Sequence, residues 1–118
     1  MKKGYANASR SHGVLTVQFA PSNGPNESSL QCILDMNDFG DILGIEVLDW
    51  QKQAGGPIGQ SPAQGPARWT YDDEVDALYV RLEHGSARIQ TKTAASARRD
   101  ERGLVVALEV QVPDPQGG

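Results

Sequence analysis

The chain has 118 residues, a formal net charge of −4 and a single cysteine. This length gives room for one compact domain, or for two small units that share a core. An acidic chain lacks the basic surface that binds phosphate, and one cysteine cannot form an intrachain disulfide, so we expect neither a nucleic-acid partner nor a disulfide-stapled secreted scaffold.

The first half of the chain begins with a polar stretch and continues with three alternating segments. Residues 1–12 have no hydrophobic period and predict a flexible N-terminal tail. Apolar and polar residues then alternate in Val14–Phe19, Leu30–Met36 and Asp41–Leu48, a pattern typical of half-buried strands. Residues 13–50 are therefore predicted to form a first three-stranded β unit.

The middle of the chain breaks this pattern. Residues 51–68 hold four Gly, three Pro and four Gln, and Ile58 is their one large aliphatic residue. Such a composition is typical of a flexible linker. Trp50 and Trp69 flank it, and we interpret them as caps on the core. An aromatic ligand platform is the alternative, for which the sequence gives no further support.

The alternation returns in the second half. Leu78, Val80 and Leu82 alternate with polar residues, and the strictest alternation of the chain runs over 104–112. Residues 69–113 are predicted to be a second β unit, in which Arg88–Ala97 is only weakly patterned. Residues 114–118 are predicted to be a second tail.

The two patterned stretches match at a constant offset of 63 residues. Leu15 then falls on Leu78, Gly40 on Gly103 and Glu46 on Glu109. Sequence periodicity of this kind indicates a repeated supersecondary unit. We expect an all-β fold in which two three-stranded antiparallel units, related by pseudo-two-fold symmetry, pack as a sandwich or an open barrel. We also expect Gly40 and Gly103 to have positive φ in equivalent turns.

Two segments of the second half carry a family resemblance. The sequence WTYDDEVDALYVRLEHG (69–85), followed by DERGLVVALEV (100–110), resembles the bacterial family called domain of unknown function 2283. The first half carries the closing motif as ILDMNDFGDILGIEVLD (33–49), in which Gly44-Ile45-Glu46 is intact, while its opening motif is degraded. The resemblance implies a β-rich fold, present here as two divergent tandem copies, and no known activity.

One acidic segment has the spacing of a calcium loop. Asp35, Asn37, Gly40 and Glu46 fall on positions 1, 3, 6 and 12 of such a loop, but Phe39 takes position 5, where an oxygen ligand is needed. The flanks alternate with a period of two, so they are strands and not the helices that a calcium loop requires. The segment predicts a hairpin turn, and we expect neither a metal nor a cofactor.

Four charged residues are the candidate binding residues. Glu46 and Glu109 occupy equivalent positions in the final strands, where they either form a symmetric carboxylate site or, in the interpretation we favour, face solvent. The offset also places Asp35 on Arg98. We therefore expect the acidic second strand of the first unit to lie beside the basic stretch 88–102, with Asp35 close to Arg98.

These features favour a non-catalytic binding or protein-interaction module over an enzyme. The main alternative is an antitoxin-like or regulatory protein that offers a sheet edge to a small partner protein, or to a second copy of itself. A hydrolase that uses Glu46 and Glu109 is the least favoured interpretation. The longest aliphatic run, Leu104–Leu108, is far too short to span a bilayer, and no apolar run follows Lys2 and Lys3, so we expect a cytoplasmic protein.

Overall fold

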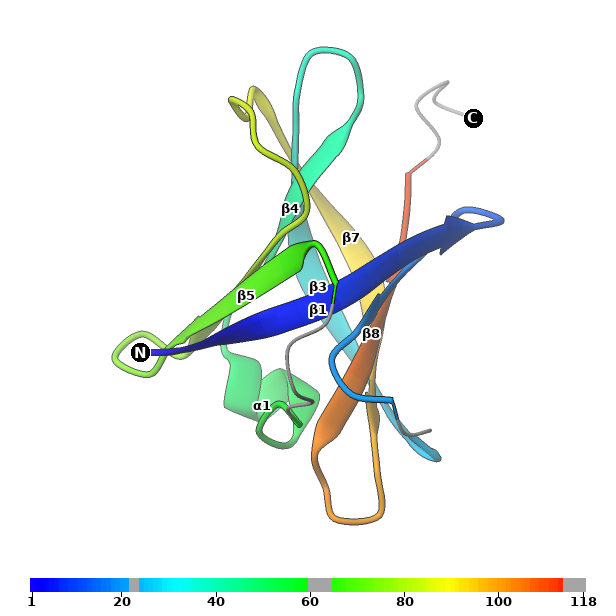
Figure 1. Cartoon of the computed structure of the whole chain (residues 1–118), viewed down its shortest axis with the longest axis vertical. Helices are drawn as coiled ribbons and strands as arrows, with labels where there is room; N and C mark the ends of the chain where they lie inside the picture. Colours follow the sequence, from blue (N-terminus) through cyan, green and yellow to red (C-terminus); the bar gives the residue numbers. More distant parts are fainter. Residues whose placement is uncertain (22–23, 60–64, 114–118) are drawn as a thin grey trace.

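Eight antiparallel strands close into a barrel in the computed structural model, which describes residues 1–21, 24–59 and 65–113 (Figure 1). In chain order the elements are β1 (Lys2–Ser11), β2 (Val14–Gln18), β3 (Asn26–Met36), β4 (Ile42–Val47), α1 (Trp50–Ala54), β5 (Ala67–Asp72), β6 (Ala77–Arg81), β7 (Ile89–Arg99) and β8 (Val105–Gln111). Around the barrel the order is β1-β2-β8-β7-β3-β4-β6-β5, and β5 pairs with β1. The prediction of an all-β chain is confirmed, and the closed barrel replaces the expected sandwich or open barrel.

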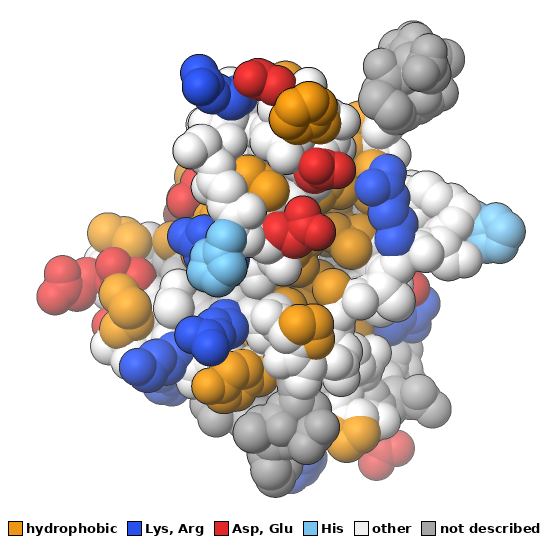
Figure 2. Space-filling model, turned by 45° about the horizontal axis from the view of Figure 1, so that its top comes forward, with side chains coloured by type: hydrophobic (Ala, Val, Ile, Leu, Met, Phe, Trp, Pro, Cys, Tyr) orange, Lys and Arg blue, Asp and Glu red, His pale blue; other side chains and the backbone are white. Residues whose placement is uncertain are grey.

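The core fills the inside of the barrel, because alternate side chains of each strand point inward. The fully buried large side chains come from both halves of the chain and from α1. They are Val17, Leu34, Ile45, Val47, Trp50, Trp69, Leu78, Val80, Val105, Val106, Leu108 and Val110. In the described part of the chain, no helix is long and apolar enough to cross a membrane. Figure 2 shows charges of both signs interspersed on one face of the molecule.

The turns that join β3 to β4 and β7 to β8 have the same hydrogen bonds. The Asn37 side-chain oxygen accepts from the backbone N–H groups of Phe39 and Asp41 at 2.9 and 3.0 Å. Asp100 likewise accepts from the backbone N–H groups of residues 102 and 104 at 2.9 and 3.0 Å. Gly40 (φ 83°) and Gly103 (φ 86°) follow in these turns, so the predicted positive φ is confirmed at both.

Residues 2–11 form strand β1, so the expected tail over 1–12 is wrong. β1 pairs with β5 through Lys2–Ala6 and with β2 through Asn7–Ser11. The turn at His12 (φ 53°) and Gly13 (φ 78°) has the positive φ values of a tight two-residue hairpin. The strand has no hydrophobic period in the sequence because small residues, Gly4 and Ala6, take inward positions.

The expected linker over 51–68 is also wrong in its described part. Its first residues belong to helix α1, whose Ala54 is buried, and its last two belong to β5. Between them Ile58 forms a parallel bridge with Val105, while Val105 N–H donates to Pro57 O at 2.7 Å. Residues 60–64 of the linker and the tail 114–118 lie outside the described residues.

Each half contributes four strands and not three. The weakly patterned stretch after Arg88 is the eleven-residue strand β7, which pairs with β3 along its whole length. The acidic second strand of the first unit thus lies beside the basic stretch, as expected. The pairing is antiparallel with Gln31 opposite Ala94, and the consequence for Asp35 and Arg98 is described below.

Candidate ligand pocket at one end of the barrel

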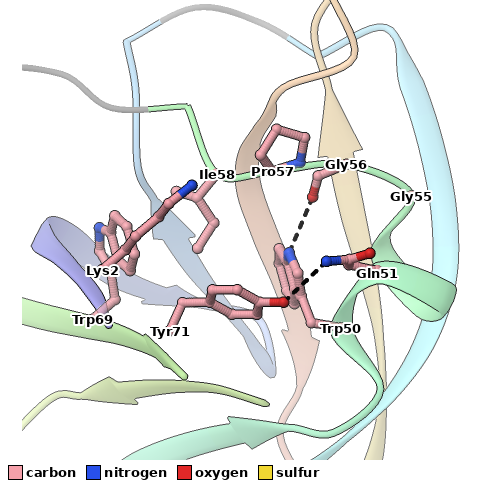
Figure 3. A pocket seen from close by; sticks show the side chains of 9 residues that line it. All are labelled: Lys2, Trp50, Gln51, Gly55, Gly56, Pro57, Ile58, Trp69 and Tyr71. Atoms are coloured by element: carbon pink, nitrogen blue, oxygen red, sulfur yellow. Dashed lines mark hydrogen bonds between the residues drawn. The ribbon is translucent and has the colours of Figure 1, made fainter. Parts of the chain in front are cut away.

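A pocket of about 440 Å³ lies between α1, the segment after it, and strands β1 and β5 (Figure 3). Three aromatic side chains and a short Gly-Pro segment make most of its wall. The lining residues are Lys2, Trp50, Gln51, Gly55, Gly56, Pro57, Ile58, Trp69 and Tyr71. Ligand pockets of proteins have this size and this mainly apolar, aromatic character.

Trp50 is the first residue of α1 and forms one wall. It is 2 % exposed, and its indole N–H donates to Gly56 O at 3.0 Å. Gly55 ends the helix at φ 80°, which lets the chain turn back across the indole ring. The bonds between Pro57, Gly59 and Val105 then attach the segment to β8, so this wall is fixed by backbone hydrogen bonds at both ends.

Trp69 forms the opposite wall from β5. Its partner across the β1–β5 pairing is Gly4, and a Cβ atom at Gly4 would lie only 2.7–2.9 Å from the indole atoms Nε1, Cε2 and Cζ2. The absence of a side chain at Gly4 is therefore what allows Trp69 to lie over β1. Phe19 packs edge-on against the same indole, with ring centroids 6.3 Å apart.

Tyr71 lies between the two tryptophans and is held by a polar network. Its hydroxyl donates to Asp76 Oδ1 at 2.5 Å and accepts from Gln51 Nε2 at 3.3 Å. The hydrogen bond to Asp76 is the main cause that raises the pKa of the Tyr71 hydroxyl. Asp76, from the β5–β6 turn, also accepts from the backbone N–H groups of Trp50 and Gln51 and so joins that turn to the start of α1.

Lys2 is the one charged residue among the described lining residues of the pocket. It stands opposite Tyr71 in the β1–β5 pairing, and its side chain points from β1 toward the pocket (Figure 3). Among the described residues it forms no ion pair, whereas the ion pairs of the chain involve Arg98 and Arg102. The pocket thus combines an apolar aromatic wall with an unpaired ammonium group.

The predicted carboxylate pair, Glu46 and Glu109, lies elsewhere and does not converge. Glu46 is on β4 and Glu109 on β8, with β3 and β7 between them. Three strand spacings separate the two residues by roughly 14 Å across the sheet. Glu109 accepts from Arg98 Nε at 2.6 Å, and Glu46 stands opposite Tyr79. This arrangement gives no shared site for one substrate.

Asp35 and Arg98 do not contact each other, so this part of the expectation is wrong. Asp35 stands opposite Gln90 and accepts from Gln90 Nε2 at 2.8 Å and from Tyr79 OH at 3.2 Å. Arg98 stands opposite Glu27 and pairs with it and with Glu109. Antiparallel pairing centred on Gln31 and Ala94 places Asp35 and Arg98 on opposite sides of that centre.

The single cysteine is a buried core residue with a thiol of low reactivity. Cys32 is 2 % exposed in the core, and burial raises the pKa of its thiol to about 11. Within the described residues, no group of three or more His, Cys, Asp or Glu side chains is placed to hold a metal ion.

Sequence reasoning missed most of the pocket. Lys2 fell in the expected tail and Gln51 in the expected linker, while Tyr71 was noted only as part of a family motif. The two tryptophans were a usable signal, because Trp50 and Trp69 line one cavity, whereas we expected them to cap the core.

Comparisons with protein-family models, with curated proteins and with solved structures found no match to this chain.

Proposed function

We propose that this protein is a non-catalytic binding module that holds a small, flat and largely apolar ligand between α1 and β5. One observation carries the proposal: both tryptophans of the chain, together with Tyr71, line a single cavity of about 440 Å³. Trp side chains bury large areas and stack on planar groups, so they are suited to holding an aromatic or similarly flat molecule.

The polar groups of the pocket support binding rather than catalysis. The nine described lining residues include no carboxylate, histidine, serine or cysteine. Of the side chains that can serve as nucleophile or general base, the lining holds Lys2 and Tyr71, and the Tyr71 hydroxyl is already bonded to Asp76 and Gln51. The hydrolase alternative relies on Glu46 and Glu109, which have β3 and β7 between them.

One unpaired edge, in strand β7, favours a second candidate function. This function is binding of a partner protein or of a second copy of this chain. Among the described strands, Ile89–Lys92 of β7 pairs with β3 but with no strand on the other side. Ile89 is 47 % exposed there. The Gln31 backbone bonds the Gln53 side chain and stands opposite Ala94, so the alternating ladder places the Lys92 N–H on this free edge. A Lys92→Pro variant removes that backbone donor, so a partner or dimer that adds a strand here should bind more weakly, as sedimentation would measure.

We also propose that the two halves are tandem copies related by pseudo-two-fold symmetry, each resembling domain of unknown function 2283. Exchanging β1–β4 with β5–β8 leaves the strand order around the barrel unchanged. At the 63-residue offset Tyr5 corresponds to Arg68 and Gln31 to Ala94, and each of these equivalent residues pairs with its counterpart. Register shifts also occur at equivalent places, after Asp35 and after Arg98.

Nuclear magnetic resonance of the two indole N–H groups tests the binding function. The chain has only two tryptophans, so a ¹⁵N-labelled sample gives two indole signals, which Trp50→Phe and Trp69→Phe assign. In a screen of flat aromatic compounds, we expect binders to shift both indole signals together at a single-site affinity. Binders that shift only outward residues, such as the Lys3 and Thr70 amides, would overturn the proposal.

A further inference from the structure

We infer that the ligand of this pocket is an aromatic anion, a planar ring that carries a carboxylate or sulfonate, with the anionic group on Lys2 and the ring between Trp50 and Trp69. The inference rests on the proposed function, because it names the chemical class of ligand for the same pocket. It comes from the polar atoms that the surrounding protein leaves without a partner.

The indole N–H and the tyrosine hydroxyl on the α1 side of the pocket already have partners. The Trp50 indole N–H donates to Gly56 O, and the Tyr71 hydroxyl both donates to Asp76 and accepts from Gln51. Asp76, the carboxylate next to this network, accepts from Tyr71 and from the Gln51 backbone N–H. A ligand gains little from replacing these bonds, since each replacement leaves a protein group unpaired.

Two donors on the β1 side have no partner among the described residues. One is the ammonium group of Lys2, which forms no ion pair there. The other is the indole N–H of Trp69, a residue that is 2 % exposed and lies over Gly4. The Trp69 N–H is in the pocket wall and has no partner in the described part of the chain, so it is available to an acceptor on a ligand.

Lys2 and Trp69 are also placed to act on the same ligand. Lys2 is two residues before Gly4, so both positions lie on the same face of β1, where the exposed Lys2 reaches the pocket and Gly4 pairs with Trp69. Both side chains line the pocket from its β1 side, and donors from these two residues, one of them charged, favour an acceptor group with negative charge. The apolar remainder of the lining, Ile58, Pro57 and the faces of Trp50 and Trp69, selects a ring.

A cationic ligand is the competing class, because aromatic side chains also enclose ammonium groups. The Lys2 ammonium lies in the same lining, and like charges in one pocket repel. We therefore expect the pocket to prefer an anion over a cation of the same shape.

Three isosteric probes test the inference by calorimetric titration: naphthalene-2-carboxylate, naphthalene-2-carboxamide and naphthalen-2-ylmethylammonium. For the unmodified chain, we expect the carboxylate to bind about fivefold more tightly than the amide, and the ammonium probe to bind most weakly. Lowering the ionic strength from about 0.15 M to about 0.01 M lengthens the Debye length from roughly 8 to 30 Å and should widen the preference.

Two neighbouring lysines give a matched pair of variants. Lys2→Met should remove the preference for the carboxylate while leaving amide binding nearly unchanged. Lys3→Met is the control, because Lys3 is the next residue on β1, faces the other side of the strand and has the same charge. We expect Lys3→Met to keep the preference.

The outcomes separate the inference from the proposed function. If carboxylate and amide bind the unmodified chain equally, or if the ammonium probe binds best, the aromatic-anion inference is overturned while the binding function stands. If Lys2→Met and Lys3→Met reduce carboxylate binding by the same factor, the anion is not held by Lys2 and the inference also fails. If no probe shifts the indole signals of Trp50 and Trp69, the proposed function fails for flat aromatic compounds, and the inference fails with it.

Discussion

Replacing Gly4 by alanine tests whether Trp69 lies over β1 because that position has no side chain. The added Cβ would lie 2.7 Å from Nε1, 2.8 Å from Cε2 and 2.9 Å from Cζ2 of Trp69. Non-bonded carbon atoms prefer about 3.5–4.0 Å, so the indole must move by roughly 0.6–1 Å or more. Phe19 packs against the same ring, and the displacement therefore spreads into the core.

Overpacking of this kind typically costs about 1–3 kcal/mol. We expect Gly4→Ala to lower the free energy of unfolding by that amount, measured by urea unfolding followed by tryptophan fluorescence. The maximum of the tryptophan emission of the folded variant should also shift, since Trp69 is one of only two tryptophans in the chain.

Gly44→Ala is the matched control on the outer face of the barrel. A Cβ there would meet the hydroxyl end of Tyr79, whose displacement breaks its bond to Asp35, and would lie 3.0 Å from Val80 O of the neighbouring strand. We expect a loss of about 0.5–1.5 kcal/mol and an unchanged tryptophan emission. A Gly4→Ala protein as stable as the parent, with the same emission, would refute the role given to Gly4.

Three further predictions concern other parts of the molecule. The Gln53 side-chain amide donates to Gln31 O and Leu48 O and accepts from Gln31 N–H at an exposed edge of β3. Gln53→Leu should therefore cost roughly 0.5–1.5 kcal/mol in urea unfolding, and a loss below about 0.3 kcal/mol would contradict its role at this edge. Backbone hydrogen bonds lower the pKa of Asp100 in the folded state, so its contribution to stability is present above the ordinary Asp pKa of about 3.9 and is lost as the pH falls through the folded value. Asp100→Asn, which copies Asn37 of the equivalent turn, should make melting less sensitive to acid, and an identical acid dependence would contradict this. The Cys32 thiol, buried with a pKa of about 11, should react with a disulfide reagent at pH 8 only as fast as the protein opens, and immediate stoichiometric labelling would be the contrary result.

The strands that the sequence predicted share one physical property, which is an inner row of large apolar side chains. β2, β4, β6 and β8 each have such a row, and hydrophobic alternation identifies it directly. β1 has Gly4 and Ala6 in its inner row because Trp69 from β5 fills the space above them. The pattern that explains β1 thus lies in another strand, at Trp69, 65 residues after Gly4, and not in the sequence of β1 itself.

The sequence did not predict the pocket or the closure of the barrel, for a related reason. Three separate segments supply the lining, from Lys2, from α1 with residues 55–58, and from β5. α1 has only five residues and is bounded by left-handed caps at Asp49 and Gly55, which leaves no helical period to read. The β1–β5 pairing, which joins residues about 65 positions apart, brings Lys2 to β5, and the hydrogen bonds of Gln51 to Tyr71 and Asp76 bring α1 there.

Asp35 and Arg98 show why equivalence in a repeat does not predict contact. Equivalent residues of two antiparallel strands meet only at the centre of the pairing, which here is Gln31 opposite Ala94. Asp35 and Arg98 each lie four residues beyond that centre, in opposite directions. At about 3.3 Å per residue they are roughly 26 Å apart along the β3–β7 ribbon, which is too far for an ion pair.

A crystal structure of the full chain with naphthalene-2-carboxylate tests the central claim most directly. We expect density for the naphthalene ring between Trp50 and Trp69, with the carboxylate within hydrogen-bond distance of Lys2 Nζ and Trp69 Nε1. Density for the probe on the outer face of the barrel, with the space between Trp50 and Trp69 filled by water, would contradict a ligand pocket at this end of the barrel.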